Sequence, residues 1–573
     1  MGNNSLEEKG NSFRKDDSFR KENSFRKDNS FLVQAGILAA AGMISRVIGL
    51  LYRSPLHRVI GDLGMGYYNT AFNFYNIILM ISSYSIPAAI SKVIAQKLAL
   101  KEYRAAHKMF LCALGYVLAV GGAASLFLFF GAGLLVEPEV IPVLRTFAPT
   151  IFVYGILGVL RGYFQAHKSM VQTSVSQILE QIANAIVSVG AAYLLIHSSF
   201  AAMEAPVDRE GRVLWGTKGA IGSAMGTGAG VLTALLFMLG MYALNKRLIH
   251  RRIQRDEHED ISSYGSILKT ITLVVTPFIL STAIYHLSST VNNILYTRAL
   301  PALKELDTVE IHSRWGVFSG QVQTISNIPV AFASAMAAAM LPAVAQLTAA
   351  KKIGEARDKI GLAVKITMII SIPCAVGLFV LARPVTALLF KNTQESEDLA
   401  TGMLMALAVS VIFYGLSTLS SQILQGLGKL NAPIFNAGLS LILQSAVASL
   451  LLFFTDLDLY AVAIANIVYS GAMCILNQIS VRKAIGYRQE IPRTFLIPLL
   501  ASVFMGAVAW GVYEALLLLT KSPRISVIPA IIIGAVLYFA LLILFRGVTE
   551  EELRGFPKGS LLVRIAKKCR LLK

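Results

Sequence analysis

The chain has 573 residues, of which 55% are hydrophobic and 15% are charged. This composition excludes an ordinary soluble globular protein and indicates a polytopic membrane protein. A formal net charge of +19 would suggest nucleic acid as the partner of a soluble protein. Here the basic residues lie in short loops between apolar segments and form no single basic face, so we expect no nucleic-acid partner.

The first thirty residues form a polar arm. Residues 11–31 repeat a six-residue unit that first appears as NSFRKD. A period of six fits neither a helix nor a strand, so we predict a disordered arm over 1–30 and no cleaved signal peptide. Its simplest role is a cytoplasmic orientation signal. Alternatively, Phe13, Phe19 and Phe25 enter an anionic leaflet while the neighbouring arginine-lysine pairs hold lipid phosphates.

Fourteen apolar segments follow the arm, and each is long enough to cross a bilayer as an α-helix. They cover about 31–52, 66–94, 107–136, 141–166, 170–196, 217–244, 264–297, 315–346, 357–381, 399–425, 432–454, 459–481, 493–519 and 525–545. With the N-terminus inside, most lysines and arginines fall at segment ends that face the cytoplasm, as the positive-inside rule requires. The sequence therefore predicts an all-α, 14-helix membrane protein with both termini in the cytoplasm.

Short similarities relate the first six segments to the next six. The similar pairs are GYFQAHKSM (162–170) and QILQGLGKL (422–430), SIPAAI (85–90) and NIPVAF (327–332), and KEYRA (101–105) and KIGEA (352–356). Two parallel six-helix lobes around a midplane site are the layout of an alternating-access carrier. We predict an N-terminal lobe at 31–246, a basic linker at 247–263, a C-terminal lobe at 264–482, helices 13 and 14 within 483–550, and a basic tail at 551–573.

An arginine lies deep in the first apolar segment. Arg46 is about 22 Å from the start of that segment, at about 1.5 Å per residue, and thus inside the hydrocarbon layer. A guanidinium at this depth costs about 2.5–3.5 kcal/mol and usually faces a polar cavity where it meets an anion. Arg53 follows two helical turns later on the same face. For Arg53 and Arg58, at the outer edge, snorkelling is the default interpretation, but Arg46 lies too deep for it.

A carboxylate also lies near the midplane, at Glu180 in the fifth segment. Three interpretations stay open: hydrogen bonds between helices, a coupling-ion or proton site, and a partner that keeps Arg46 charged without substrate. Polar residues of the seventh and eighth segments are candidates for the opposite wall of a cavity. The predicted substrate-binding residues are Arg46, Arg53, Arg58, Asn73, Glu180, His286, Asn293 and Gln323.

The sequence offers no chemistry for an enzyme. The four cysteines are scattered without metal-ligand or disulfide spacing, at Cys112, Cys374, Cys474 and Cys569. Neither a nucleophile triad nor paired catalytic carboxylates appear. We therefore expect a transporter without catalytic residues, metal or bound cofactor, coupled to the membrane potential or to Na⁺ or H⁺.

Three stretches near the N-terminus resemble a known family. ISRVIG (44–49) with Arg53, RVIGDLGMGYY (58–68) and IPAAISK (86–92) resemble the opening of the stage V sporulation protein B-like polysaccharide and lipid II flippases. These belong to the multidrug/oligosaccharidyl-lipid/polysaccharide exporter superfamily, and the resemblance runs from about residue 31 to the C-terminus. It implies a bacterial plasma-membrane protein that flips an undecaprenyl-pyrophosphate-linked saccharide outward, with lipid II as the leading case, for peptidoglycan or cell-surface polysaccharide synthesis.

The resemblance also implies roles for residues. The first-helix arginines of the family's lipid II flippases line a cationic cavity. Arg46 matches the first of them, and Arg53 falls one residue later than the second. The family's acidic residue at the start of helix 2 and its later cavity arginines have no clear match here, where Tyr67, Asn73 and Thr324 lie nearby. Anionic lipids and cell-wall synthesis proteins are further expected partners.

Two other functions stay open at this stage. A cation-coupled drug exporter of the same fold would need Glu180 and not Arg46, because an arginine pair repels an organic cation. A non-transporting scaffold for a cell-wall or sporulation complex would use the basic arm for docking.

Overall fold

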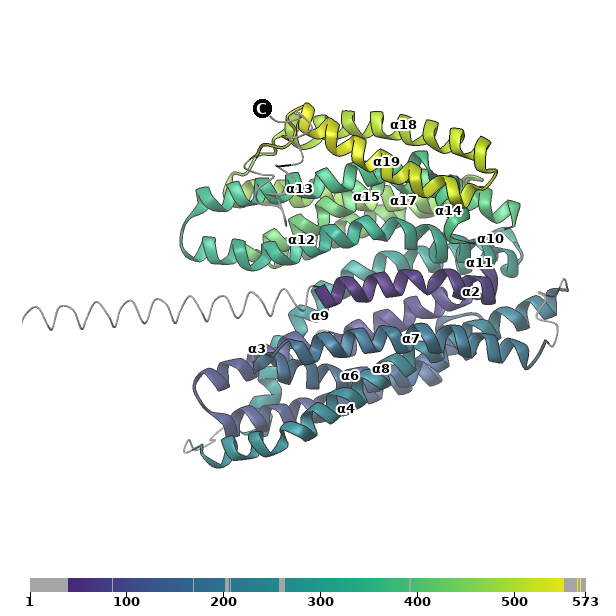
Figure 1. Ribbon diagram of the computed structural model, residues 1–573. Coiled ribbons are helices and arrows are strands. Elements are labelled where there is room, and N and C mark those ends of the chain that lie inside the picture. Colours follow the sequence, from purple (N-terminus) through teal and green to yellow (C-terminus); the bar gives the residue numbers. More distant parts are fainter. Residues whose placement is uncertain are drawn as a thin grey trace, which may run out of the picture.

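A computed structural model describes residues 40–84, 86–167, 169–200, 206, 208–256, 263–390, 393–550, 564 and 567. Within these residues every regular element is a helix (Figure 1). The predicted all-α class is therefore confirmed. The repeat arm at 1–30 lies outside the described residues, as does nearly all of the basic tail.

The described chain begins with the helix Ala40–Leu51. The first half continues with α2 (Arg53–Leu79), the π-helix η1 (Met80–Tyr84), α3 (Ile86–Ala99), α4 (Tyr103–Phe130), α5 (Ala132–Leu135), α6 (Ile141–Ala166), α7 (Val171–His197) and α8 (Arg209–Gln254). The second half comprises α9 (Tyr264–Ile294), η2 (Leu295–Ala299), α10 (Leu300–Lys304), α11 (Thr308–Gly316), η3 (Val317–Val322), α12 (Gln323–Ala349), α13 (Ile353–Val380), α14 (Ala382–Leu389), α15 (Gln394–Gly426), α16 (Asn431–Phe454), α17 (Leu459–Ile485), η4 (Pro492–Leu496), α18 (Ile497–Thr520) and α19 (Pro523–Leu544).

Ten helices of the described chain are long and apolar enough to cross a membrane. Other predicted spans are interrupted or incompletely described. The first span is described only from Ala40 onward, the second is divided by η1, and the eighth is divided among α11, η3 and α12. The exact count of fourteen therefore stays a prediction.

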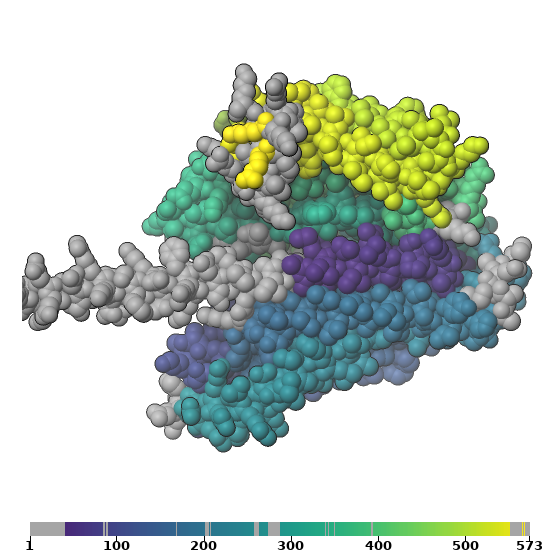
Figure 2. Space-filling model, viewed as in Figure 1, coloured from purple at the N-terminus to yellow at the C-terminus, as the bar shows by residue number. Residues whose placement is uncertain are grey.

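The helices pack in two groups (Figure 1). We call α2–α8 the first bundle and α12–α17 the second bundle. Helix α9 contacts α2, α3 and α4 as well as α16, so it links the two bundles, and α18 packs on α13 and α19. Figure 2 shows the purple start of the described chain between the blue helices of the first bundle and the green and yellow second half. The two six-helix lobes and their boundaries stay a prediction.

Small residues allow the helices of the first bundle to approach closely. A Cβ atom on Gly230 of α8 would lie 2.5 Å from the backbone oxygen of Glu180 on α7. A larger side chain at this position would push α7 away, as expected for close packing of membrane helices through glycine. Glycine at position 230 thus allows α8 to pack closely against the backbone of α7 at Glu180.

Helix α8 defines the two ends of the molecule. It finishes at the basic stretch Lys246–Arg255, which marks the basic end. It begins at Arg209, whose Nη2 lies 3.3 Å from Oδ1 of Asp307. We call this second end the closed end, because α2 of the first bundle packs against α11 of the second half there, on the right of Figure 1.

Candidate functional site

A cavity of about 800 Å³ lies between the two bundles. Its walls come from the helix Ala40–Leu51, α2, α6, α7, α8, α9, η3, α12, α15 and α17. Five of the predicted substrate-binding residues line it: Arg46, Arg53, Asn73, Glu180 and Gln323. Among the described residues of the lining, the charged ones are Arg46, Arg53 and Glu180.

The two arginines both reach the second bundle. Arg46 Nη1 donates to the backbone oxygen of Ala331 at 3.2 Å, and Arg53 Nη1 donates to Thr324 Oγ1 at 2.7 Å. Arg53 lies seven residues after Arg46, and Thr324 lies seven residues before Ala331, so this helix runs antiparallel to α12. The predicted common face of the two arginines is therefore observed, and in this conformation both bond to uncharged acceptors.

The same helix lies beside α7 on its other side. A Cβ atom on Gly49 would be 3.6 Å from Gln181 Oε1, and Asn184 Nδ2 is 3.4 Å from the Tyr52 hydroxyl. Each step of three residues along one helix matches three along the other, so the two helices run parallel. In this register Arg46 corresponds to Ile178, which precedes Glu180 by two residues or about 3 Å along the helix axis.

Glu180 is bonded to an arginine that the sequence analysis did not select. Arg161 Nη2 on α6 lies 2.7 Å from Glu180 Oε2, and Arg161 Nε donates to Ser176 Oγ at 2.9 Å. The Arg161 side chain is 6% exposed and that of Glu180 is 16% exposed. Of the interpretations that were open for Glu180, the structure therefore shows a bond between helices, with Arg161 and not Arg46 as its ionic partner.

Arg161 was not predicted as a site residue because it lies near the end of its apolar segment, where an arginine is usually interpreted as a cytoplasmic anchor. The available signal was its position inside the segment, five residues before the end of α6 at Ala166. That position alone does not identify a partner, because the carboxylate comes from the next helix.

The remaining predicted site residues lie elsewhere. Arg58 is exposed and is not among the residues that line the cavity. Asn293 is fully buried, and its Nδ2 donates to Thr70 Oγ1 at 3.0 Å, behind the lining. The side chain of His286 lies outside the described residues. A substrate-binding role for these three residues stays a prediction. The lining of the cavity does not support that role for Arg58 and Asn293.

Uncharged polar groups dominate the rest of the lining. Ser289 Oγ of α9 lies 3.3 Å from Asn73 Oδ1 of α2. Other hydroxyl and amide side chains of the lining include Asn76, Gln181, Asn184, Ser288, Ser319, Gln323, Ser326, Asn327, Ser410 and Asn466. Such groups can exchange hydrogen bonds with sugar hydroxyls. The described residues hold no cluster of three or more metal-ligating side chains.

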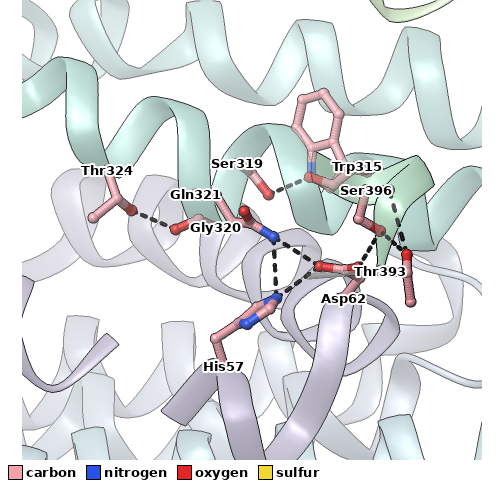
Figure 3. A network of polar contacts seen from close by, with 9 residues as sticks. All are labelled: His57, Asp62, Trp315, Ser319, Gly320, Gln321, Thr324, Thr393 and Ser396. Carbon is pink, nitrogen blue, oxygen red and sulfur yellow. Dashed lines mark hydrogen bonds and ion pairs between the residues drawn. The ribbon is translucent and has the colours of Figure 1, made fainter. Parts of the chain in front are cut away.

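At the closed end, one carboxylate joins the bundles (Figure 3). Asp62 Oδ1 accepts from His57 Nε2 at 2.7 Å and from Gln321 Nε2 at 2.9 Å, and Asp62 Oδ2 accepts from Ser396 Oγ at 2.6 Å. His57 and Asp62 flank Gly61, whose φ of 69° turns the chain between the first two predicted spans. We call these four side chains, His57, Asp62, Gln321 and Ser396, the Asp62 network.

The bonds of this network favour an ionised carboxylate. Burial alone raises the pKa of Asp62, but the hydrogen bond and charge of His57, with the bonds from Ser396 and Gln321, hold that pKa below its ordinary value. Since an ionised carboxylate only accepts hydrogen bonds, all three donors can be satisfied together. The Asp62 network therefore holds η3 and α15 of the second half against α2.

Further contacts close the same end. Glu137 lies 3.3 Å from Arg298 Nε and 3.5 Å from His312 Nε2, which come from the other half of the chain. Glycine brings the backbones together: a Cβ atom on Gly66 would overlap the backbone oxygen of His312, and one on Gly316 would overlap that of Asp62. The molecule is thus tightly sealed at the closed end, beyond the two arginines.

Comparison with known proteins agrees with this architecture. A family profile described as "Lipid II flippase MurJ" matches residues 108–527, well over half of the chain. Stage V sporulation protein B of Bacillus subtilis (strain 168) is 23% identical over 532 residues, covering 91% of this chain and 97% of that protein.

Solved structures share the fold. The structure titled "Lipid II flippase MurJ, inward closed conformation" covers 89% of this chain and 98% of its own, with a TM-score of 0.61 and 16% identity. An inward-facing multidrug resistance MATE family transporter of the MOP superfamily covers 77% of this chain and 94% of its own, with a TM-score of 0.57 and 15% identity. These identities show the fold alone, whereas the extent of the profile match decides the family. The resemblance seen in the sequence is therefore confirmed: the chain belongs to the MurJ lipid II flippase family and is a membrane flippase, not an enzyme.

Proposed function

We propose that this flippase carries an undecaprenyl-pyrophosphate-linked saccharide from the inner to the outer leaflet, with lipid II as the leading substrate. The observation that carries the proposal is the placement of Arg46 and Arg53 on one face of a helix in the wall of a cavity between two bundles. The family profile supports the same substrate class.

The chemistry of the arginines suits a pyrophosphate. An isolated anion that crosses a bilayer loses its hydration at a cost of about tens of kcal/mol, so a carrier must provide cations along the path. Guanidinium groups bind phosphate oxygens through paired, charge-assisted hydrogen bonds, which are about twice as strong as bonds to neutral acceptors. A pyrophosphate would therefore displace Ala331 and Thr324 as the acceptors of Arg46 and Arg53.

The polar lining suits the saccharide that the pyrophosphate carries. Amide and hydroxyl groups such as those of Asn73, Gln181 and Gln323 can bond to sugar hydroxyls without adding charge. The polyprenyl tail would stay in the bilayer beside the protein. In this way the cavity needs to accommodate only the polar head of the lipid.

We infer that this conformation is open toward the cytoplasm. The basic end faces the cytoplasm in the predicted topology, and the Asp62 network seals the opposite end. Outward release would require the contacts of Asp62 and Glu137 with the second half to break. Outward movement of the anion across a membrane potential that is negative inside would gain about 2.3 kcal/mol per charge per 100 mV, so the potential is our proposed driving force, with H⁺ or Na⁺ coupling as the alternative.

A cation-coupled drug exporter is the second candidate, because a MATE family transporter shares the fold. That function needs a carboxylate available to a cation. The one carboxylate among the described lining residues is Glu180, which is bonded to Arg161 at 2.7 Å. The pairing favours the anion carrier. The sporulation relative supports a third alternative, a flippase for another polyprenyl-linked glycan.

Complementation of a bacterial strain depleted of its lipid II flippase tests the proposal. We expect rescue by the wild-type chain and no rescue by Arg46→Ala, with membrane expression of both checked by immunoblot. Rescue by Arg46→Ala would contradict the anion-binding role of the cavity. Absence of rescue by a well-expressed wild-type chain would exclude lipid II as the substrate and leave another polyprenyl-linked glycan or the drug-exporter function.

A further inference from the structure

The ion pair between Arg161 and Glu180 lies at the edge of the substrate cavity, but its two members differ in position. Glu180 lines the cavity, whereas Arg161 lies behind it between α6 and α7. Arg161 is held in place by Ser176, whose hydroxyl accepts from Arg161 Nε and donates to the backbone oxygen of Thr173 at 2.7 Å. The anionic member of the pair therefore faces the compartment that we assign to an anionic substrate.

An unneutralised carboxylate would harm that compartment. The parallel register of the first helix and α7 places Glu180 within one helical turn of Arg46 along the axis. A free carboxylate there would repel a pyrophosphate and offer itself to Arg46 in competition with the substrate. Arg161 prevents both effects, because its guanidinium bonds Glu180 Oε2 and cancels its charge locally.

Charge balance then assigns the ligand class. With Glu180 paired, the net charge of the lining comes from Arg46 and Arg53, whose observed acceptors are neutral. Without Arg161, the same lining would hold two cations and one free anion and would tolerate an organic cation better. The residue that decides between these cases is outside the cavity wall.

We propose that Arg161 is a specificity-determining positioning residue, which neutralises Glu180 so that the cavity selects a lipid pyrophosphate over a lipophilic cation. This inference rests on the proposed function and extends it to a residue behind the cavity wall. It predicts that the effect of Arg161 depends on Glu180.

Ligand binding to the purified full-length protein tests this dependence. The anionic probe is geranylgeranyl pyrophosphate, and the cationic probe is tetraphenylphosphonium. We expect Arg161→Met to weaken binding of the anionic probe about tenfold, the size of one unit charge acting over about 10 Å at an effective dielectric constant of about 20. The same variant should bind the cation more tightly. In Arg161→Met/Glu180→Gln, which lacks both charges, anion binding should return to within about threefold of wild type, because no free carboxylate remains.

Two further variants separate this role from a structural one. Arg161→Lys keeps the positive charge and should keep the anion preference even if it loses the bond to Ser176. Arg145→Met removes an exposed arginine from the same helix, α6, and should leave both affinities unchanged. Size-exclusion chromatography identifies any variant that fails to fold, and Arg161→Lys then carries the test.

Unchanged anion binding in folded Arg161→Met, or a double variant as weak as that single variant, would overturn the inference. Failure of the proposed function would look different: the wild-type protein would bind tetraphenylphosphonium in preference to the pyrophosphate. In that case Arg161→Met would still increase the cation preference if Arg161 neutralises Glu180.

Discussion

The cavity and the closed end use charge in opposite ways. In the cavity, Arg46 and Arg53 bond to a carbonyl and a hydroxyl of α12, and neither forms an ion pair with another described residue. At the closed end, Asp62 accepts hydrogen bonds from Gln321 and Ser396 of the other half of the chain, and Glu137 forms an ion pair with Arg298. The first region can accept an anion, whereas the carboxylates of the second are already paired within the protein.

This difference separates binding from closure. An arginine that bonds to neutral acceptors forms stronger hydrogen bonds when a charged ligand replaces those acceptors. Such an arginine suits a substrate that must bind and then be released. A buried carboxylate that accepts from three donors loses hydrogen-bond energy if any donor moves away. Such a carboxylate suits a contact that holds two bundles together.

The largest effect is expected in the cavity. Replacing Arg46 or Arg53 with alanine should each weaken binding of a prenyl pyrophosphate by about 10- to 150-fold, since a hydrogen bond to a charged group contributes about 1.5–3 kcal/mol. Arg58→Ala is the matched control, because Arg58 is exposed and outside the lining. Isothermal titration with the purified protein measures these constants. An equal loss in Arg58→Ala would show that general surface charge, and not the cavity, binds the ligand.

The next effect concerns the backbone contact at the closed end. Gly66→Ala should separate α2 from α11, because the added Cβ atom would overlap the backbone oxygen of His312. Overpacking of this kind costs about 1–3 kcal/mol. In a background without native cysteines, a cysteine introduced by Ser326→Cys in the cavity should then react faster with an impermeant maleimide added outside.

Gly240→Ala is the control for this experiment, because a Cβ atom there would have no neighbour within 4 Å. It should leave the labelling rate unchanged. If Gly66→Ala also leaves the rate unchanged, the close contact between α2 and α11 does not keep the molecule closed.

A smaller opening is expected from Asp62→Asn. The asparagine keeps the shape of the side chain, but it has no negative charge and has an NH₂ group in place of one acceptor oxygen. The hydrogen bonds from Gln321 and Ser396 would therefore be weakened or lost. We expect a severalfold increase in the same external labelling rate, corresponding to about 1–2 kcal/mol for weakened bonds across the bundles.

The pH dependence of closure follows from the same residue. Because the pKa of Asp62 is lowered in the closed state, its contribution to closure is fully present above the ordinary aspartate pKa of about 4 and is lost only as the pH falls through the lowered value. Because a maleimide reacts with the thiolate, the labelling rate at each pH is divided by that of a fully exposed control thiol. This normalised rate should be the same at pH of about 5.5 and about 7.5 if Asp62 sets it. A steep increase over that interval would show that another group controls opening.

The smallest effect is expected from Arg209→Ala. Arg209 and Asp307 are 60% and 53% exposed, and exposed ion pairs contribute about 0–1 kcal/mol. External labelling should change by less than about threefold, although this pair also spans the two halves of the chain. A change as large as that of Asp62→Asn would mean that an exposed contact stabilises the closed end as much as a buried one.

Sequence periodicity was sufficient to predict that Arg46 and Arg53 share a helix face, but it was insufficient to predict the side chains that surround them. The spacing of Arg46 and Arg53 fixes their common face through helix geometry alone. The partner of Glu180 lies nineteen residues earlier on another helix, and the pairing depends on how α6 and α7 pack. The donors to Asp62 from Gln321 and Ser396 are more distant still in sequence, so no local pattern could have predicted them.

The repeats and the apolar segments showed the same limit. Segment length and composition correctly predicted an all-helical membrane protein, because each span must satisfy its backbone bonds internally. They did not predict that π-helical turns interrupt the second and eighth spans at η1 and η3. Those irregularities depend on contacts between helices, and local hydropathy does not record such contacts.

The most direct test of the central claim is translocation by the purified protein in liposomes. A fluorescent undecaprenyl-pyrophosphate-linked saccharide would be placed in both leaflets, and its accessibility to an impermeant quencher would be followed over time. We predict that wild-type protein makes the whole lipid pool accessible and that Arg46→Ala, at equal incorporation, does not. Equal translocation by both proteins would contradict the assignment of the cavity arginines to the lipid pyrophosphate.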